Sequence, residues 1–214
     1  MPDTQDRRAA DSLAHVTPAL IDAVLFDMDG TLLDSHAAVE RAWVSVALRQ
    51  GLDVEEVLRD IHGIPAETSL RRLLPGADEA TIAAEIAAHE EQECLDLDGV
   101  VPLPGAHDLI AFLDEHRTPW AVVTSAMPRL ALARLGAAGF TPPILVTPVD
   151  VPRGKPAPDG FLEAARRCGV PPERCLAIED SPGGLAAARA SGAVVVNVGV
   201  GGATLTALLA QLRG

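Results

Sequence analysis

The sequence lacks any apolar run long enough to cross a membrane. A membrane helix needs about 18 consecutive apolar residues, and no stretch of the 214 residues reaches that length. The beginning, MPDTQDRRAADSLAHVTPALI, is polar and charged and lacks the apolar centre of a secretory signal peptide. We therefore expect a cytoplasmic protein without a membrane partner, in which residues 1–20 form a loose leader.

Cysteines and aromatic residues are also scarce. The three cysteines, Cys94, Cys168 and Cys175, are odd in number and lack the spacing of metal ligands, so we expect free thiols. Aromatic residues make up 3% of the chain, which limits the stacking of nucleobases on the protein.

Positive charge is scarce as well. The 17 Lys and Arg residues oppose 30 Asp and Glu residues, which gives a formal net charge of −13. This charge repels phosphate backbones and anionic membranes, so the composition argues against nucleic acid as a partner. A small anionic substrate would need a local cation.

Short apolar runs alternate with helix-like stretches along the rest of the chain. Such runs, apolar on both faces and separated by helices, are typical of buried parallel strands. We expect them at residues 23–27, 120–125, 144–147, 175–180 and 193–198. The predicted fold class is therefore α/β, with a doubly wound parallel sheet.

One connection between these strands is too long for a simple crossover. About ninety residues separate the first two runs, whereas loops in such units usually have about 2–6 residues. The pattern from Ala37 to Leu95 is helical throughout, and Pro102, Pro104 and Gly105 then mark the return to the sheet. We predict a core formed by residues 21–36 and 101–214, with residues 37–100 as an inserted helical domain.

Polar residues interrupt the apolar runs at their carboxyl ends, where open α/β sheets bind ligands. The interruptions supply carboxylates, one ammonium group and two hydroxyls: Asp27, Asp29, Thr124, Ser125, Lys155, Glu179 and Asp180. Clustered carboxylates repel one another unless a cation such as Mg²⁺ holds them together.

This set of groups suits phosphoryl transfer from a phosphate monoester. A carboxylate can attack phosphorus to give an aspartyl-phosphate. A second carboxyl group just beyond it can protonate the leaving alkoxide and later deprotonate water. Lys155 would neutralise charge, and groups at Thr124, Ser125 and Ala126 would hold the phosphate oxygens.

Four short motifs, DMDGT, VTSA, GKPAPD and IEDSPGG, occur in the order typical of the haloacid dehalogenase superfamily. The resemblance covers almost all of the chain after Ala23, and the insertion resembles the helical cap of that superfamily. The segments AAVERAW, EEVLRDIHG, TSLR, TSAMP and RGKPAPD more narrowly resemble bacterial phosphatases of hexitol and hexose phosphates. The resemblance implies Mg²⁺-dependent hydrolysis of a small phosphorylated sugar or polyol. We expect a monomer or weak dimer.

The resemblance also implies individual roles for the motif residues. Asp27 would be the nucleophile and a metal ligand, and Asp29 would be the general acid and base and would bind the metal through its carbonyl. Asp180 would bind the metal, and Glu179 would do so directly or through water. The second motif leaves open whether Thr124 or Ser125 supplies the key hydroxyl.

Polar residues of the insertion are candidates for recognising the sugar. Arg41, Trp43 and His62 could touch substrate, although Trp43 could equally pack a helix face and His62 could be a loop histidine. Glu67 and Thr68 could bind sugar hydroxyls.

Two other functions fit the same scaffold. A phosphomutase of the β-phosphoglucomutase type would need an arginine and a histidine in the cap, where this chain has Ala66 and Val39. A non-enzymatic binding protein is the second alternative. Retention of every charged group that the chemistry requires argues against it.

Overall fold

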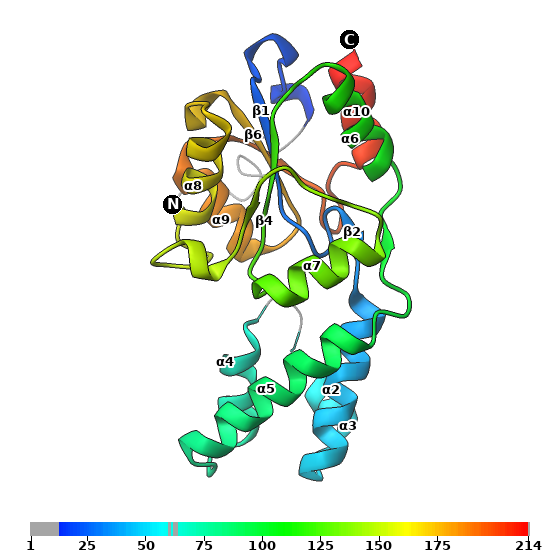
Figure 1. Ribbon diagram of the computed structural model, residues 1–214, viewed down its shortest axis with the longest axis vertical. Coiled ribbons are helices and arrows are strands. Elements are labelled where there is room, and N and C mark those ends of the chain that lie inside the picture. Colours follow the sequence, from blue (N-terminus) through cyan, green and yellow to red (C-terminus); the bar gives the residue numbers. More distant parts are fainter. Residues whose placement is uncertain (1–12, 60, 62–63, 214) are drawn as a thin grey trace.

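The computed structural model of this chain describes residues 13–59, 61 and 64–213 (Figure 1). His62 therefore lies outside the described residues, as does most of the expected leader. Two short 3-10 helices, η1 (Leu13–His15) and η2 (Pro18–Leu20), precede the first strand. Val16 between them is buried in the core, so this part of the expected leader packs onto the protein.

Five parallel strands form the central sheet, in the order β5-β4-β1-β6-β7. They are β1 (Ala23–Phe26), β4 (Trp120–Val123), β5 (Leu145–Val146), β6 (Cys175–Glu179) and β7 (Val194–Asn197). Strands β1 and β6 pair with Ala23 opposite Cys175. The predicted parallel α/β sheet is confirmed.

Helices cover both faces of the sheet, as Figure 1 shows. Because successive side chains of a strand point to opposite faces, Val24 and Phe26 pack on one side of β1 and Ala23 and Leu25 on the other. The first side is covered by α6 (Ala106–Glu115), α7 (Pro128–Ala137) and α10 (Leu205–Arg213). The second is covered by α8 (Asp159–Cys168) and α9 (Pro182–Ser191).

Four helices follow β1 and extend away from the sheet (Figure 1). They are α2 (His36–Gln50), α3 (Val54–Leu58), α4 (Ala66–Leu73) and α5 (Glu79–Leu95), and we call them the helical segment. They pack around an apolar cluster of their own that includes Trp43, Val46, Leu70 and Ile82.

The chain enters and leaves the helical segment through two short antiparallel strands. Strand β2 (Leu33–Asp34) pairs with β3 (Val101–Pro102), with Leu33 opposite Pro102. The two crossings between the sheet and the helical segment therefore lie side by side.

The two ends of α9 carry the residues that usually begin and end a helix. Pro182 is its first residue, the Ser181 hydroxyl accepts a hydrogen bond from Gly184 N at 3.1 Å, and Gly192 ends the helix with a φ of 87°. Proline at a first turn and glycine in the left-handed region after the last turn are the usual helix boundaries.

Two further 3-10 helices of the described residues are η3 (Pro148–Asp150) and η4 (Pro172–Arg174).

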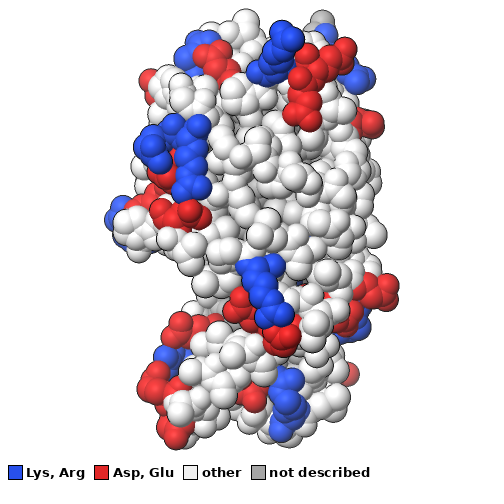
Figure 2. Space-filling model, in the orientation of Figure 1, with Lys and Arg blue, Asp and Glu red and all other residues white. Residues whose placement is uncertain are grey.

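Charged side chains on the surface lie mostly beside charges of opposite sign. On the face drawn in Figure 2, basic and acidic side chains alternate in small groups. Arg167 pairs with Glu163 and Asp150, and Arg71 pairs with Glu67 and Glu79. Among the described residues, no helix combines the length and the apolar character needed to span a bilayer.

His89 is a buried histidine of the helical segment. Its ring lies 4.4 Å from that of Trp43, measured between ring centroids. Burial, together with the positive charges of Arg134 and Arg49, lowers the pKa of His89 to about 4. The folded protein therefore favours the neutral ring.

We expect His89 to reduce the stability of the protein in acid. An unfolded histidine takes up a proton near pH 6.5, whereas the folded His89 resists it until about pH 4. The contribution of a neutral His89 is therefore complete above about pH 6.5 and is lost as the pH falls toward 4. One pKa unit corresponds to about 1.4 kcal/mol, so the loss is on the order of 3 kcal/mol.

Urea unfolding of the wild type and of His89→Gln at pH 7 and pH 4.5 measures this effect. The free energy of unfolding should fall less in His89→Gln than in the wild type. His116→Gln, which changes an exposed histidine, is the control and should follow the wild type. Equal losses in all three proteins would contradict the assignment.

Candidate active site

The motif residues meet at the carboxyl edge of the sheet because β4, β1 and β6 are adjacent and parallel. Asp27 directly follows β1, Thr124 follows β4 and Asp180 follows β6. The backbone N–H of Asp27 donates to Ile178 O at 2.9 Å, which continues the pairing of β1 with β6 by one residue. Carboxylate oxygens of Asp27, Glu179 and Asp180 lie within 4.8 Å of one another.

Lys155 bridges two of these carboxylates. Its Nζ donates to Asp27 Oδ1 at 2.5 Å and to Glu179 Oε1 at 2.6 Å, and it lies 5.3 Å from the centroid of the Phe161 ring. Burial disfavours the charged ammonium group, but the charges and hydrogen bonds of Asp27 and Glu179 outweigh burial and raise the pKa of Lys155. The loop before α8 is thereby fixed against the ends of β1 and β6.

The remaining charge at this edge is negative. Burial raises the pKa of Asp27 well above its usual range. The positive charge of Lys155 opposes this rise, and the negative charges of Glu179 and Asp180 add to it. Burial and the charge of Glu179 raise the pKa of Asp180 to about 6. With all groups ionised, the three carboxylates and one ammonium group carry a formal charge of −2, which is the repulsion that the raised pKa values of Asp27 and Asp180 express, and the donors are all oxygens. That donor set suits a hard divalent cation such as Mg²⁺.

Gly30 allows the loop after β1 to lie directly against Asp180. Its φ is 81°, and a Cβ at this position would lie 2.3 Å from Asp180 Oδ2. Any other residue would push Asp180 out of the carboxylate cluster. The Thr31 hydroxyl donates to Asp180 Oδ1 at 3.4 Å.

Glu179 is fully buried, and both of its carboxylate oxygens are engaged by protein donors. Oε1 accepts from Lys155, and Oε2 accepts from the backbone N–H groups of Asp180 and Ser181, both at 2.8 Å, and from the Ser181 hydroxyl at 3.0 Å. A Cβ on Gly184 would lie 1.5 Å from Oε1, so the first turn of α9 needs glycine there. Glu179 thus holds Lys155 and the 180–181 turn.

Asp29 belongs to a different group of side chains. The Ser35 hydroxyl donates to Asp29 Oδ1 at 2.6 Å, and Arg134 Nη1 donates to the same oxygen at 3.0 Å. Arg134 is 4% exposed and also donates through Nη2 to Glu93 Oε1 at 2.7 Å. Burial raises the pKa of Glu93, although the charge of Arg134 opposes this rise.

Arg134 lies outside the four motifs and is not among the residues predicted from the sequence. The available signal was an arginine four residues after Leu130 and next to Leu135, on the face of a helix that packs against the core. An arginine on a buried face requires acceptors, and here two carboxylates supply them.

The residues of the second motif line a small pocket beside Lys155. Its volume is about 20 Å³, enough for about one water molecule. Thr124 is buried, and its hydroxyl accepts a hydrogen bond from Ala126 N at 3.0 Å. Ser125 is exposed, and within the described chain its hydroxyl makes no hydrogen bond.

The candidate residues of the helical segment have other partners. Arg41 forms two hydrogen bonds of 2.7 Å with the Asp96 carboxylate, which joins α2 to the end of α5. Trp43 is buried against His89. Glu67 pairs with Arg71.

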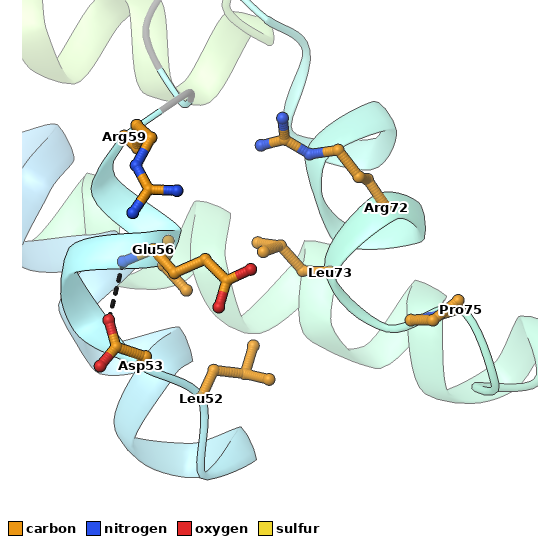
Figure 3. Close-up of a pocket in the computed structure, with 8 residues that line it drawn as sticks. Leu52, Asp53, Glu56, Arg59, Arg72, Leu73 and Pro75 are labelled. Atoms are coloured by element: carbon orange, nitrogen blue, oxygen red, sulfur yellow. Dashed lines mark hydrogen bonds between the residues drawn. The ribbon is translucent and has the colours of Figure 1, made fainter.

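The helical segment contains a larger pocket, of about 310 Å³, between α3 and α4 (Figure 3). Arg59 and Arg72 point toward it from opposite sides, with Glu56 between them. All of its lining residues belong to the helical segment and its connections, so it is separate from the carboxylate cluster at the edge of the sheet.

A family model and two similar proteins all carry descriptions of hydrolases or phosphatases. A family model described as haloacid dehalogenase-like hydrolase matches residues 21–192. Hexitol phosphatase A of Escherichia coli (strain K12) is 46% identical over 175 residues, covering 81% of this chain and 81% of that protein. Fructose-1-phosphate phosphatase YqaB of the same strain is 33% identical over 182 residues, covering 82% and 95%.

A solved structure agrees with these sequence relatives. Crystalline CbbY from Rhodobacter sphaeroides, in complex with xylulose-(1,5)bisphosphate, superposes with a TM-score of 0.68 at 29% identity, covering 81% of this chain and 84% of that chain. The family match spans the helical segment, all four motifs and the sheet strands β1, β4, β5 and β6. The resemblance inferred from the motifs is confirmed, and the chain belongs to the haloacid dehalogenase-like hydrolase family.

Proposed function

We propose that this protein hydrolyses phosphate monoesters of small sugars or sugar alcohols through an aspartyl-phosphate on Asp27. The observation that carries the proposal is the buried cluster in which Lys155 bridges Asp27 and Glu179 beside Asp180. Relatives named as phosphatases of hexitols and of fructose 1-phosphate support the substrate class. We also propose a cytoplasmic location and a monomer or weak dimer.

The reaction needs two steps at phosphorus. In the first, a carboxylate oxygen of Asp27 attacks phosphorus, the bond to the ester oxygen breaks, and Asp29 gives its proton to the leaving alkoxide. In the second, Asp29 takes a proton from water as the water oxygen attacks phosphorus. The bond to Asp27 then breaks, and inorganic phosphate leaves.

Mg²⁺ is the cofactor that we propose for this site. Asp27 and Asp180 would hold it with their side chains and Asp29 with its carbonyl, while Glu179 would act indirectly because its oxygens already accept protein donors. The cation supplies neutralisation of charge between the anionic nucleophile and the anionic phosphate. Lys155 contributes a second positive charge from the protein itself.

We assign the phosphate-binding hydroxyl of the second motif to Ser125. The Thr124 hydroxyl is buried and engaged with Ala126 N, whereas Ser125 is exposed beside Lys155. Ser125 and the amide group of Ala126 would hold the phosphate oxygens, with Thr124 shaping the turn.

We also propose that residues 37–100 act as a cap domain on a core formed by residues 21–36 and 101–214. The separate apolar cluster of the helical segment and the paired β2 and β3 crossings support this division. Sugar recognition would come from polar groups of the cap such as His62, Glu67 and Thr68. The phosphomutase alternative loses support because Val39 packs against the apolar cluster of the helical segment.

Asp27→Asn should abolish turnover because it removes the charge of the nucleophile while keeping its volume. Phosphate release from sorbitol 6-phosphate with Mg²⁺ measures the effect. Asp22→Asn, at the other end of β1 and paired with Arg174, is the matched control and should retain activity.

The same Asp27→Asn variant should also be more stable without metal. Because the fold raises the pKa of Asp27, the neutral Asn should raise the melting temperature in EDTA at pH 7.5. Phosphate release near the wild-type rate would refute the aspartyl-phosphate mechanism.

Ser125→Ala should weaken phosphate binding, whereas Thr124→Val should chiefly lower the melting temperature. A hydrogen bond to a charged group contributes about 1.5–3 kcal/mol, so we expect Ser125→Ala to raise the inhibition constant of inorganic phosphate by about 10- to 100-fold. The opposite pattern in the two variants would transfer the assignment to Thr124.

Monophosphates of hexitols and hexoses should have a higher kcat/KM than bisphosphates and nucleotides. The net charge of −13 penalises each negative charge that lacks a matching cation, and aromatic residues for stacking a base are few. A panel of phosphorylated metabolites with Mg²⁺, scored by released phosphate, measures this order. Preference for a nucleoside monophosphate would show that the assignment of the cap is wrong.

A further inference from the structure

A buried arginine links Asp29 to the helical segment. Arg134 lies on α7, donates through Nη1 to Asp29 Oδ1 at 3.0 Å and donates through Nη2 to Glu93 Oε1 at 2.7 Å. Glu93 is on α5 and is 8% exposed. The three side chains thus form a carboxylate–guanidinium–carboxylate row that crosses from the sheet domain to the helical segment.

This arginine is costly for the fold. Its Nε meets no acceptor among the described residues and is buried, and an unsatisfied buried donor costs about 1–3 kcal/mol. The neighbouring positions on the same face of α7, Leu130, Ala131 and Leu135, pack against the core. Apolar residues in place of both Arg134 and Glu93 would fill this space without charges to bury, and such replacement of a whole buried ion pair is often neutral or stabilising. Packing alone therefore does not explain Arg134.

The hydrogen bonds at Asp29 suggest what the arginine does. Both donors, Ser35 Oγ at 2.6 Å and Arg134 Nη1 at 3.0 Å, reach Oδ1. Within the described chain, Oδ2 accepts no hydrogen bond. Two donors on one oxygen fix the orientation of the carboxyl group and leave the other oxygen to carry a proton.

We infer that Arg134 is a positioning residue for the reaction, which holds Asp29 by Oδ1 so that Oδ2 exchanges the proton. This inference rests on the proposed function. In the first step the proton on Oδ2 passes to the ester oxygen as its bond to phosphorus breaks. In the second step Oδ2 receives a proton from the attacking water, so Asp29 ends protonated as it began.

Glu93 allows the charged Arg134 side chain to be buried beside Asp29. Its carboxylate balances the charge of the guanidinium group and fixes the direction of Nη1. His89 Nε2 lies 3.5 Å from the other oxygen of Glu93, so the row is packed on the side of the helical segment as well. Arg134 therefore has a defined orientation before substrate binds.

Two substrates with different leaving groups can distinguish a positioning role of Arg134 from a purely structural one. An alkoxide from a sugar alcohol needs a proton to leave, whereas p-nitrophenolate leaves without one. The ratio kcat/KM reports the steps through the first bond cleavage, so it isolates the donation of this proton. If the Asp29 carboxyl group loses its orientation, kcat/KM for sorbitol 6-phosphate should therefore fall, whereas kcat/KM for p-nitrophenyl phosphate should stay nearly unchanged.

The test compares Arg134→Met, Arg134→Lys and the matched control Arg129→Met. Arg129 joins the same two helices through an exposed pair with Glu91 and makes no contact with Asp29. General acid catalysis contributes about 10²- to 10⁴-fold, so Arg134→Met should lower kcat/KM for sorbitol 6-phosphate by about 10- to 100-fold. We expect a change below about 3-fold for p-nitrophenyl phosphate, partial rescue in Arg134→Lys and wild-type values in Arg129→Met.

Equal losses on both substrates, or no loss on either, would overturn the inference. A crystal structure of Arg134→Met adds a readout that does not depend on activity, since the Asp29 carboxyl group should turn away from its wild-type orientation. An unchanged Asp29 would also overturn it. Failure of the wild type to release phosphate from either substrate would instead refute the proposed function, and the orientation of Asp29 would then decide the inference alone.

Discussion

The bridge from Lys155 to two buried carboxylates is the interaction on which the rest of the site depends. Without the ammonium group, three carboxylates with oxygens within 4.8 Å of one another would share a buried site. An uncompensated buried ion costs several kcal/mol. The bridge also fixes three chain segments to one another, namely the ends of β1 and β6 and the loop before α8. Lys155 thus sets both the geometry of the strand ends and the negative charge that is left for a cation.

The close packing around this bridge limits which residues can stand nearby. Gly30 and Gly184 lie where a Cβ would overlap the carboxylates of Asp180 and Glu179. Glu179 accepts four hydrogen bonds in all, from one ammonium group, two backbone amides and one hydroxyl. A change at either glycine would therefore disturb the charges at the strand ends without removing any of them.

The strand-end residues could be predicted from the sequence because topology alone brings them together. Asp27 and Asp180 each follow an apolar strand, and β1 and β6 are neighbours in a parallel sheet. Arg134 could not be predicted in this way, because its partners lie 105 and 41 residues away along the chain and depend on how α7 packs against α5. The proposed choice of Ser125 over Thr124 likewise rests on a contact that the sequence does not show, the hydrogen bond from Ala126 N to the Thr124 hydroxyl. Sequence patterns predict periodic burial and strand ends, but they do not fix the direction of a side chain on a helix.

The pairing of β2 with β3 places the two ends of the helical segment at adjacent positions, since Leu33 lies opposite Pro102 and Asp34 opposite Val101. Paired strands are about 5 Å apart, so a segment of almost any length can begin and end there without moving the sheet. The helical segment also has its own apolar cluster. Evolution can therefore lengthen, replace or recombine this segment as a unit while the carboxylates and Lys155 keep their places. With sugar recognition in the helical segment, as we propose, substrate range and chemical step can change independently within one gene.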